Sequence, residues 1–413
     1  MAQVNITLSE EELLQVFTGD REEAIRFLLE RILNEVMKAE SEVQLGASMH
    51  ERTDERQDYR NGSRERKLTT RIGTLTLEVP RHRNEPFHTM VFENYSRSEA
   101  SLIATMVQMV IAGVSTRKVS KVVETLCGKT YSKSMVSDLC KRLDEDIRKF
   151  KQQSLDWLDA PFLMVDATYF KARENHKIVS KAFMVALAIK SDGLREVVGF
   201  DVYEAENDYC WKQFLLDLKQ RGLKSTEVII SDAHKSIRKA IAEIYPSTAW
   251  QRCQVHFLRN ILDETPPKHK EGLKTELREM FDAEDIRSAR KKRDEIINDY
   301  MPVAEKAMRI LDDGFEDAMT VMNLSKNARK FLRSTNILER LNRELKRRSD
   351  VIQIFPNKAS VLRLMGAVTL EYSDRQIVVS RIFAEEKFAK IRSAVSTEYR
   401  QIAARQVALM KTS

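Results

Sequence analysis

The sequence predicts a multidomain, mainly α-helical protein built around one α/β domain that an all-α insertion interrupts. Gly and Pro number only 12 and 8 in 413 residues, which favours a helix-rich chain. Strand-like segments cluster between residues 160 and 256, whereas apolar residues recur at helical spacing before and after that cluster. Residues 257–330 are charged and helical in pattern, and residues 331–385 again predict long helices.

The composition indicates the compartment better than it indicates the partner. The net charge of +7 fits a nucleic-acid partner, but many other soluble proteins are equally basic. None of the four cysteines forms a CxxC pair or a disulfide pattern, so we expect a reducing compartment. We find no signal peptide and no run of 18 apolar residues, and we therefore expect a cytoplasmic protein without a membrane span.

The first 97 residues are expected to form a dimerisation and DNA-binding region. Apolar residues recur at helical spacing over 7–45, and their face is too wide for this segment to bury alone. Either the same domain or a second copy of the chain covers that face. Asn61-Gly62 predicts a turn, and residues 69–79 alternate like two strands broken at Gly73.

Arginines gather in this β-rich stretch, where a phosphate-contacting arm and a solvated hairpin are both possible. The candidate phosphate contacts are Arg60, Arg64, Arg71 and Arg81.

Residues 98–155 predict three helices, the last two arranged as a helix-turn-helix DNA-binding domain. We expect the helices over 98–112, 115–126 and 132–149, with Ser115 and Ser132 as N-caps. A DNA-reading third helix would present its exposed N-terminal side. The candidate DNA contacts there are Lys133, Ser134, Ser137 and Lys141. Helical hairpins also occur without DNA, so a structural role stays open.

Residues 156–262 predict the first part of the α/β domain. The expected strands span 162–170, 179–190, 194–203, 228–232 and 249–255, with helices over 208–221 and 233–244. Three strands with short connections predict an antiparallel meander, and the wholly apolar fourth strand predicts a buried, parallel position. Three strands, helix, strand, helix, strand is the order of an RNase H-like domain.

The rest of the chain is expected to complete that domain. An α-helical insertion is predicted over 263–330, the second part of the catalytic domain over 331–385, and a polar helical tail with a frayed end over 386–413.

Two aspartates stand in the apolar strands of the predicted domain. Asp166 lies within the first strand, where an ionised carboxylate is costly unless it is paired or binds a cation. Asp232 ends the fourth strand, and chemistry gathers at the carboxyl ends of strands in α/β sheets. In an RNase H-like order these strands are neighbours, so both carboxylates could face one site. A water-facing Asp166 and a helix N-cap at Asp232 are the alternatives.

The third acid is expected on the helix that starts near Asn336. Beside its leucine stripe, Glu339, Arg343 and Lys346 share one arc at about 100° per residue. Residues 329–348 hold eight Lys or Arg against two Asp or Glu, the densest basic segment of the chain. Candidate DNA contacts on this helix are Arg343, Arg347 and Arg348. A capping-box Glu339 behind Asn336 is the alternative.

Such a triad of carboxylates can hold two divalent cations about 4 Å apart, which activate a water or 3′-hydroxyl and stabilise the leaving oxygen. Hard oxygen ligands favour Mg²⁺ or Mn²⁺ over zinc. Cys253 and His256 have the spacing of half a zinc finger, but no second pair stands at matching distance. They are either a buried Cys and a junction His, or a support for the acidic site.

These motifs resemble the mutator-type transposases of bacterial insertion sequences, a branch of the DDE transposases with a Cys-x2-His signature. The resemblance covers nearly the whole chain, and its matching stretches are 59–62, 79–81, 113–117, 165–167, 231–232, 251–256, 259–260 and 335–342. It implies metal ligation by Asp166, Asp232 and Glu339, and a position for Lys346 near the scissile DNA. It adds Asn61, Arg117, Lys118, Arg252 and Arg259 to the candidate DNA contacts.

The resemblance implies a DNA transposase that binds terminal inverted repeats, cleaves the ends and joins 3′-hydroxyls to target DNA with two Mg²⁺ or Mn²⁺ ions. Relatives form circular intermediates, which would make the route copy-out, paste-in. The expected partners are double-stranded DNA and a second copy of the chain, at the bacterial nucleoid, with no membrane and no small-molecule substrate. A catalytically silent, domesticated DNA-binding protein and a structure-specific metal nuclease remain the alternatives. The intact acidic triad favours the enzyme.

Overall fold

The computed structural model describes residues 21–49, 51, 53, 56–70, 73–89, 91, 100–127, 131–376 and 381–412. The chain divides into two compact units, Met1–Arg142 and Leu143–Ser413. Within the described ranges, no helix is both long enough and apolar enough to cross a membrane.

The first unit opens with a helix packed on a β-hairpin. Helix α2 (Arg21–Leu45) contacts strand β2 (Gly73–His82), which pairs antiparallel with β1 (Arg60–Thr70). Met37 joins the core made by Leu68, Leu75, Leu77 and Val79, so part of the helix face is covered within its own unit. Residues 7–20 of the predicted helix lie outside the described residues.

The turn predicted at Asn61-Gly62 is wrong. Both residues lie inside β1, where the pairing with β2 shifts between Arg60 and Ser63. Gly62 has a φ of +73°, a conformation that glycine adopts without steric cost and that suits a β-bulge. The same dipeptide therefore bends a strand here and does not end it.

Three helices complete the first unit: α3 (Ala100–Ile111), α4 (Thr116–Cys127) and α5 (Lys133–Leu139). Ser132 caps α5 by accepting a hydrogen bond from the Met135 N–H. The predicted single helix over 132–149 is wrong, because a 3-10 turn at Cys140–Arg142 separates α5 from α6 (Leu143–Gln152). Val136 packs in the core of the first unit, whereas α6 already belongs to the second.

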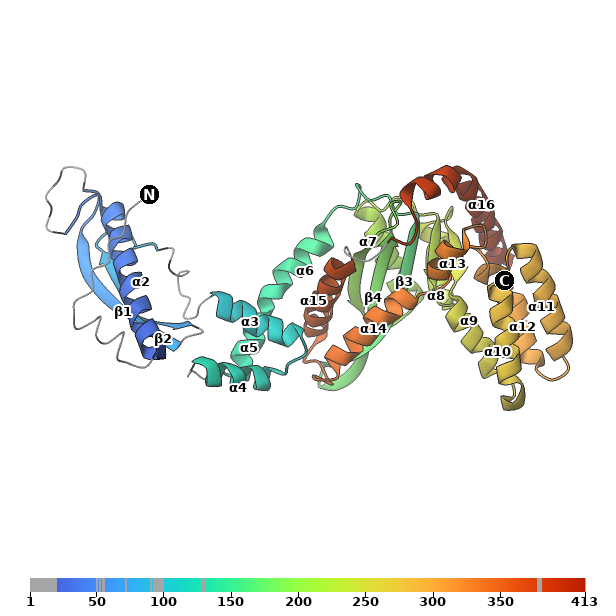
Figure 1. The fold of residues 1–413 in the computed structure, drawn as a ribbon, viewed down its shortest axis with the longest axis horizontal. Coiled ribbons are helices and arrows are strands. Elements are labelled where there is room, and N and C mark those ends of the chain that lie inside the picture. Colours follow the sequence, from blue (N-terminus) through green and yellow to red (C-terminus); the bar gives the residue numbers. More distant parts are fainter. Residues whose placement is uncertain are drawn as a thin grey trace. The chain divides into compact units, whose positions relative to one another are not determined.

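The second unit is built on a five-stranded mixed sheet. Its strands are β3 (Phe162–Glu174), β4 (Lys177–Ile189), β5 (Arg195–Tyr203), β6 (Val228–Ser231) and β7 (Ala249–Arg252), in the order β5-β4-β3-β6-β7 (Figure 1). β3, β4 and β5 form the expected antiparallel meander, and β6 and β7 run parallel to β3. β7 ends earlier than the predicted residue 255, because helix α9 begins at Gln254.

Helices cover both faces of this sheet (Figure 1). α7 (Asp208–Gln220) and α8 (Lys235–Ile244) bury Trp211, Phe214 and Ile237 against one face. α15 (Lys358–Gln376) and α6 contact the other, where Phe150 of α6 stacks on Phe200 of β5 at 4.9 Å.

The predicted helical insertion follows β7 and has a core of its own. It consists of α9 (Gln254–Asp263), a 3-10 turn (Pro267–His269), α10 (Lys270–Phe281), α11 (Ile286–Tyr300), α12 (Glu305–Ala318) and α13 (Lys326–Leu332). Leu273, Leu277, Ile296, Leu311 and Phe315 are fully buried in that core. The chain then returns to the sheet through α14 (Asn336–Ser349) and α15.

The last helix, α16 (Glu385–Thr412), is more than the polar, frayed tail that its composition predicts. It buries Tyr399 and Ala403 and packs on β7, the edge strand of the sheet. The Gln406 side chain accepts a hydrogen bond from the Trp250 N–H and donates one to the Trp250 carbonyl, each at 2.8 Å. One side-chain amide thus pairs both backbone groups of Trp250 on this edge strand.

Candidate active site

Asp166 and Asp232 lie at the same level on neighbouring parallel strands. β3 and β6 pair with Met164 opposite Ile230, and each aspartate follows its strand's paired residue by two positions. The apolar runs Phe162–Val165 of β3 and Val228–Ile230 of β6 hold both strands in the centre of the sheet. The sheet therefore places two carboxylates side by side, Asp166 within β3 and Asp232 just after β6.

Asp166 is held in a defined orientation and is electrostatically perturbed. Its Oδ2 accepts a hydrogen bond from Asn342 Nδ2 at 2.9 Å, and its Oδ1 accepts one from the Ala167 N–H at 2.9 Å. Burial raises the pKa of Asp166 to about 7, and the charge of Asp232 adds to that rise. Like charges this close disfavour joint ionisation.

Asp232 is not the N-cap of helix α8. That position is occupied by His234, whose N–H donates to Asp232 Oδ1 at 3.1 Å. The Asp232 side chain is half-buried, in the short segment between β6 and α8. It remains beside Asp166, because its charge is the second-largest influence on the pKa of that residue.

Glu339 reaches this region from the first turns of α14. Thr335, not Asn336, precedes the helix as its N-cap, so the capping box considered for Asn336 and Glu339 is not formed. Glu339 Oε1 lies 3.7 Å from His256 Nε2. The pKa of His256 is raised to about 9, mainly by the adjacent Cys253 sulfur and further by the charges of Asp166 and Glu339. The raised pKa favours the cationic form of this imidazole, 3.7 Å from Glu339, at neutral pH.

Cys253 connects β6, α14 and its own segment before α9 near the acids. Its N–H donates to the Ser231 carbonyl at 2.7 Å, at the end of β6. Its buried sulfur accepts from the Thr335 N–H and hydroxyl, both at 3.4 Å, at the start of α14. Burial raises the pKa of the thiol, but the interaction with His256 outweighs it and lowers the pKa overall.

Across the ranges that the structure describes, no three His, Cys, Asp or Glu side chains stand close enough together to hold a metal ion. Glu339 faces His256 in this conformation. The chemistry of the donors nevertheless fits a hard divalent cation, because Asp166, Asp232 and Glu339 offer only carboxylate oxygens. A cation would also offset the burial, and then the charge of Asp232, which together raise the pKa of Asp166.

Three residues near the acids were not predicted. Asn342 follows Glu339 by one helical turn, a spacing that could have marked it. Glu206 lies in the loop between β5 and α7, and its pKa is raised by burial and by the charge of Asp232. Its N–H donates to the Tyr169 hydroxyl at 3.4 Å. No sequence pattern pointed to Glu206 or Tyr169, because a loop brings them together.

The cations of α14 differ in how they are held. Arg343 and Lys346 are exposed. Arg347 is exposed but pairs with Glu344 at 2.7 Å, and Arg348 is buried and pairs with the same carboxylate at 2.7 Å. These arginines, Arg347 first, lower the pKa of Glu344 to about 2. Arg348 therefore stabilises helix α14 through its ion pair with Glu344.

The other predicted DNA contacts fall into exposed and engaged groups. The exposed ones, which form no ion pair with any described residue, are Asn61, Arg64, Arg81, Arg117, Lys118, Lys133, Ser134, Ser137 and Arg259. Lys141 is exposed and pairs with Asp138 at 2.7 Å. Arg60 donates to the Ala47 and Ser48 carbonyls, and Arg252 lies 4.3 Å from the Phe257 ring centre. Arg71 lies outside the described residues.

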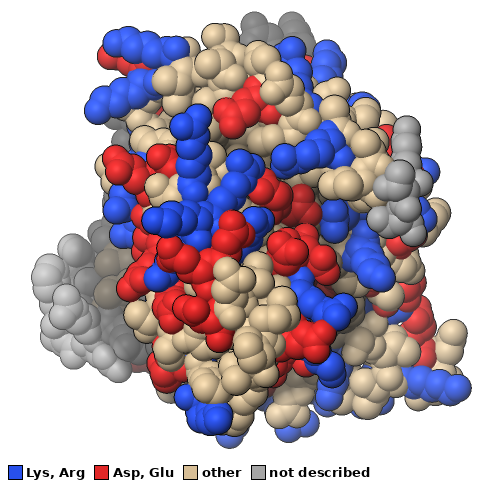
Figure 2. All heavy atoms as spheres, turned by 90° about the vertical axis from the view of Figure 1, so that its right-hand side faces the viewer, with Lys and Arg blue, Asp and Glu red and all other residues tan. Residues whose placement is uncertain are grey.

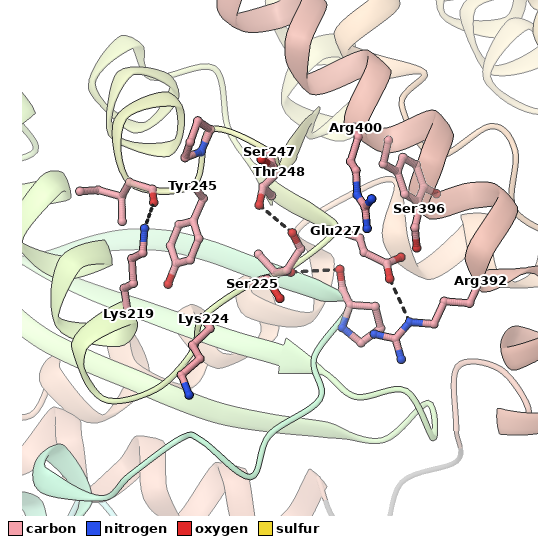
Figure 3. A pocket seen from close by; sticks show the side chains of 15 residues that line it. Lys219, Lys224, Ser225, Glu227, Tyr245, Ser247, Thr248, Arg392, Ser396 and Arg400 are labelled. Carbon is pink, nitrogen blue, oxygen red and sulfur yellow. Dashed lines mark hydrogen bonds and ion pairs between the residues drawn. The ribbon is translucent and has the colours of Figure 1, made fainter.

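A cavity of about 470 Å³ lies at the opposite end of the parallel strands (Figure 3). Thr226 and Thr248, which precede β6 and β7, line it together with residues of α16. Two of its cations are engaged: Arg392 pairs with Glu227 at 3.0 Å, and Lys219 donates to the Ile244 carbonyl at 2.6 Å. The cavity thus lies where α16 packs against the sheet, and it is remote from the aspartates.

The surface of the helical insertion and α16 carries both signs of charge. Figure 2 shows Asp and Glu side chains interleaved with Lys and Arg on this face. Pairs such as Arg290 with Glu316 at 2.9 Å account for part of that pattern. The net positive charge of the chain is therefore not gathered on this face as a whole.

The comparisons with known proteins agree on one family. The model of the Mutator family of transposases matches residues 1–378. A Staphylococcus aureus protein, the transposase for insertion sequence element IS256 in transposon Tn4001, is 42% identical over 384 residues, which are 92% of this chain and 98% of that protein. A Rhizobium meliloti transposase for ISRM5 is 40% identical, covering 87% of this chain and 90% of its own length.

A Mycobacterium tuberculosis transposase for IS1081 is 34% identical over 90% of both chains. Among solved structures, the Mos1 transposase paired-end complex with left transposon end is 11% identical, covers 40% of this chain and 61% of its own, and has a TM-score of 0.15. A likeness at that score carries no argument about the fold.

Proposed function

Because this chain belongs to the Mutator family of transposases, we propose that it cleaves transposon ends and joins them to target DNA at Asp166, Asp232 and Glu339. The observation that carries this proposal is that Asp166 and Asp232 occupy corresponding positions along the adjacent parallel strands β3 and β6. The strand order β5-β4-β3-β6-β7 supports an RNase H-like reading of the sheet.

We propose that the three acids bind two Mg²⁺ or Mn²⁺ ions, with Asp166 and Asp232 as the permanent pair. Such ions supply an activated water or 3′-hydroxyl and stabilise the leaving oxygen. Glu339 completes the set by turning from His256 toward the aspartates, since it lies 3.7 Å from the imidazole in this conformation. Asn342 holds the Asp166 carboxylate in place through its hydrogen bond.

We propose positioning roles for Cys253 and His256. Cys253 fixes the start of α14 to the end of β6, and His256 keeps the Glu339 carboxylate near the site. Lys346 and Arg343 are exposed on the arc of α14 that carries Glu339, where they can contact the phosphates beside the scissile bond.

The first unit supplies DNA recognition in this proposal. α4 and α5 act as a helix-turn-helix that binds the terminal inverted repeat, and the β1–β2 hairpin contacts phosphates through Arg64 and Arg81. Two copies of the chain hold two DNA ends at the bacterial nucleoid. A copy-out, paste-in route predicts circles in which the two ends abut.

The products of one reaction separate the proposal from its alternatives. The full-length protein is incubated with Mg²⁺, a labelled duplex carrying the inverted repeat, and a plasmid target. The proposal predicts cleaved ends and labelled plasmid. Cleavage without labelled plasmid would instead identify a structure-specific nuclease, and binding without cleavage would identify a silent DNA-binding protein.

A further inference from the structure

A strongly cationic cavity lies between the end of α10 and helix α13. Its volume is about 310 Å³. Four of its lining residues are cations of α13 and the position that follows it, namely Lys326, Arg329, Lys330 and Arg333. Asp282 is the one carboxylate in the lining, so four positive charges face one negative charge. None of these residues was among the DNA contacts predicted from the sequence.

Arg329 and Arg333 are held mainly by hydrogen bonds to backbone carbonyls, which leave most of the positive charge of the cavity uncancelled. Arg329 is 8% exposed, and its guanidinium donates to the Ala283 and Glu284 carbonyls at 3.1 and 3.3 Å. Arg333 donates to the Phe281 carbonyl at 3.3 Å and to Asp282 Oδ1 at 2.5 Å. Neutral carbonyls satisfy N–H donors without neutralising a guanidinium. Burial, and then the charge of Arg333, lowers the pKa of Arg329.

Lys326 and Lys330 are exposed at this cavity, and neither has an ion-pair partner within the described parts of the chain. Some lysines of the insertion are paired: Lys274 lies 3.1 Å from Glu271, and Lys292 lies 3.4 Å from Glu279. Others, such as Lys268 and Lys306, are exposed and have no ion pair among the described residues, so an unpaired lysine does not by itself mark a site. Lys326 and Lys330 differ because they stand at one cavity beside two fixed arginines and a single carboxylate, and this local excess of positive charge attracts an anion.

The cavity is joined directly to the candidate active site. The Arg333 carbonyl accepts a hydrogen bond from the Gln254 N–H at 2.9 Å, and Thr335 contacts the Cys253 sulfur. Only Ser334 and Thr335 separate the Arg333 position from α14, the helix that carries Glu339. An anion bound here would lie along the chain segment that positions this acid.

We propose that this cavity binds the phosphodiester backbone of the duplex DNA engaged at the acidic site, through Lys326 and Lys330 backed by Arg329 and Arg333. The proposal rests on the proposed function, since it assigns part of the DNA path to this cavity. Contacts to phosphate carry no sequence information, so the cavity contributes equally to any duplex.

The test compares Lys326→Ala/Lys330→Ala with Lys268→Ala/Lys306→Ala in the full-length protein. The control also removes two exposed lysines of the insertion, but neither lines the cavity. Affinity is measured against salt concentration for an inverted-repeat duplex and for a scrambled duplex of equal length. The cavity variant should bind both duplexes roughly 10-fold more weakly, and its log–log salt slope should fall by about 2. Lys326→Arg/Lys330→Arg should retain binding, because it keeps both charges.

Each outcome decides the question. If wild type binds duplex DNA and the cavity variant matches the lysine control in affinity and slope, the cavity proposal is wrong while the proposed function stands. If wild type binds no duplex at all, the proposed function fails and the cavity proposal fails with it. Thermal unfolding of all variants shows that a lost affinity is not a lost fold.

Discussion

Asn342 Nδ2 donates a hydrogen bond to Asp166 Oδ2 at 2.9 Å, and this contact joins helix α14 to the central strand β3. Glu339 lies one turn earlier on the same helix, so the bond fixes the rotation of the helix that carries it. Asn342 also restricts the Asp166 carboxylate to one orientation. A single neutral amide thus orders two of the three acids.

Replacing Asn342 with Ala should lower the rate of DNA end cleavage by roughly 10- to 100-fold, the usual cost of losing a residue that orients a metal ligand. DNA affinity should change little, because Asn342 is half-buried and points to Asp166. Asn336→Ala, an exposed position on the same helix, is the matched control. Single-turnover cleavage rates equal to wild type for Asn342→Ala would remove this residue from the account.

The raised pKa of Asp166 predicts how metal-free stability depends on pH. Its folded pKa is about 7 against an ordinary value of 3.8, so between these pH values the folded protein holds a proton that the unfolded chain has released. This residue therefore lowers stability progressively as pH rises from about 4 to 7. Asp166→Asn removes that loss.

Thermal unfolding with a chelator at pH 5 and pH 8 checks this sign. Asp166→Asn should gain stability relative to wild type on going from pH 5 to pH 8, because the ionised carboxylate that opposes folding is absent. Added Mg²⁺ should stabilise wild type more than the variant. A difference between the two proteins that is the same at both pH values would contradict the assigned electrostatics.

Gln406 should matter for stability although it lies near the end of the chain. Gln406→Leu leaves the Trp250 N–H without its partner, whereas the Trp250 carbonyl keeps the hydrogen bond from the Thr320 hydroxyl at 2.8 Å. Leaving a buried polar group unpaired costs about 1–3 kcal/mol. Gln401→Leu, at an exposed position of the same helix, should leave the denaturant midpoint near that of wild type.

Helix α5 offers a test of end recognition. Lys133 is exposed one residue after the N-cap Ser132, where a recognition helix would meet DNA. Lys133→Ala should weaken binding to the inverted-repeat duplex in a gel shift, whereas Lys268→Ala, at an exposed position of the helical insertion, serves as the control. Equal shifts for both variants and wild type would remove the helix-turn-helix from the account.

Most of the sheet could be predicted from the sequence, because its strands carry patterns that depend on local residues. The apolar runs at Phe162–Val165 and Val228–Ile230 indicate buried strands, and the strand order then brings Asp166 next to Asp232. The 3-10 break at Cys140–Arg142 and the role of α16 were not predictable in this way. They depend on which core each segment joins and on an edge strand distant in sequence.

Part of the candidate site could likewise be predicted from the sequence, and part could not. Three acids could be selected because two follow the apolar runs of buried strands and the third lies on a basic helix. The sequence could not predict the contact of Glu339 with His256, because it depends on the rotation of a helix. Nor could it predict the position of Glu206, which depends on the geometry of a loop. Arg348 was predicted to contact DNA because it lies in a basic segment, but it is a buried partner of Glu344.

Cleavage and joining by Glu339→Gln in Mg²⁺ tests the central claim most directly. The substitution keeps the size of the side chain and removes its charge. Glu264→Gln, at an exposed carboxylate that pairs with no cation among the described residues, is the control. We predict that Glu339→Gln binds the inverted-repeat duplex like wild type yet forms neither cleaved ends nor joined products, while Glu264→Gln forms both. Wild-type amounts of both products from Glu339→Gln would show that the chemistry does not depend on this acid.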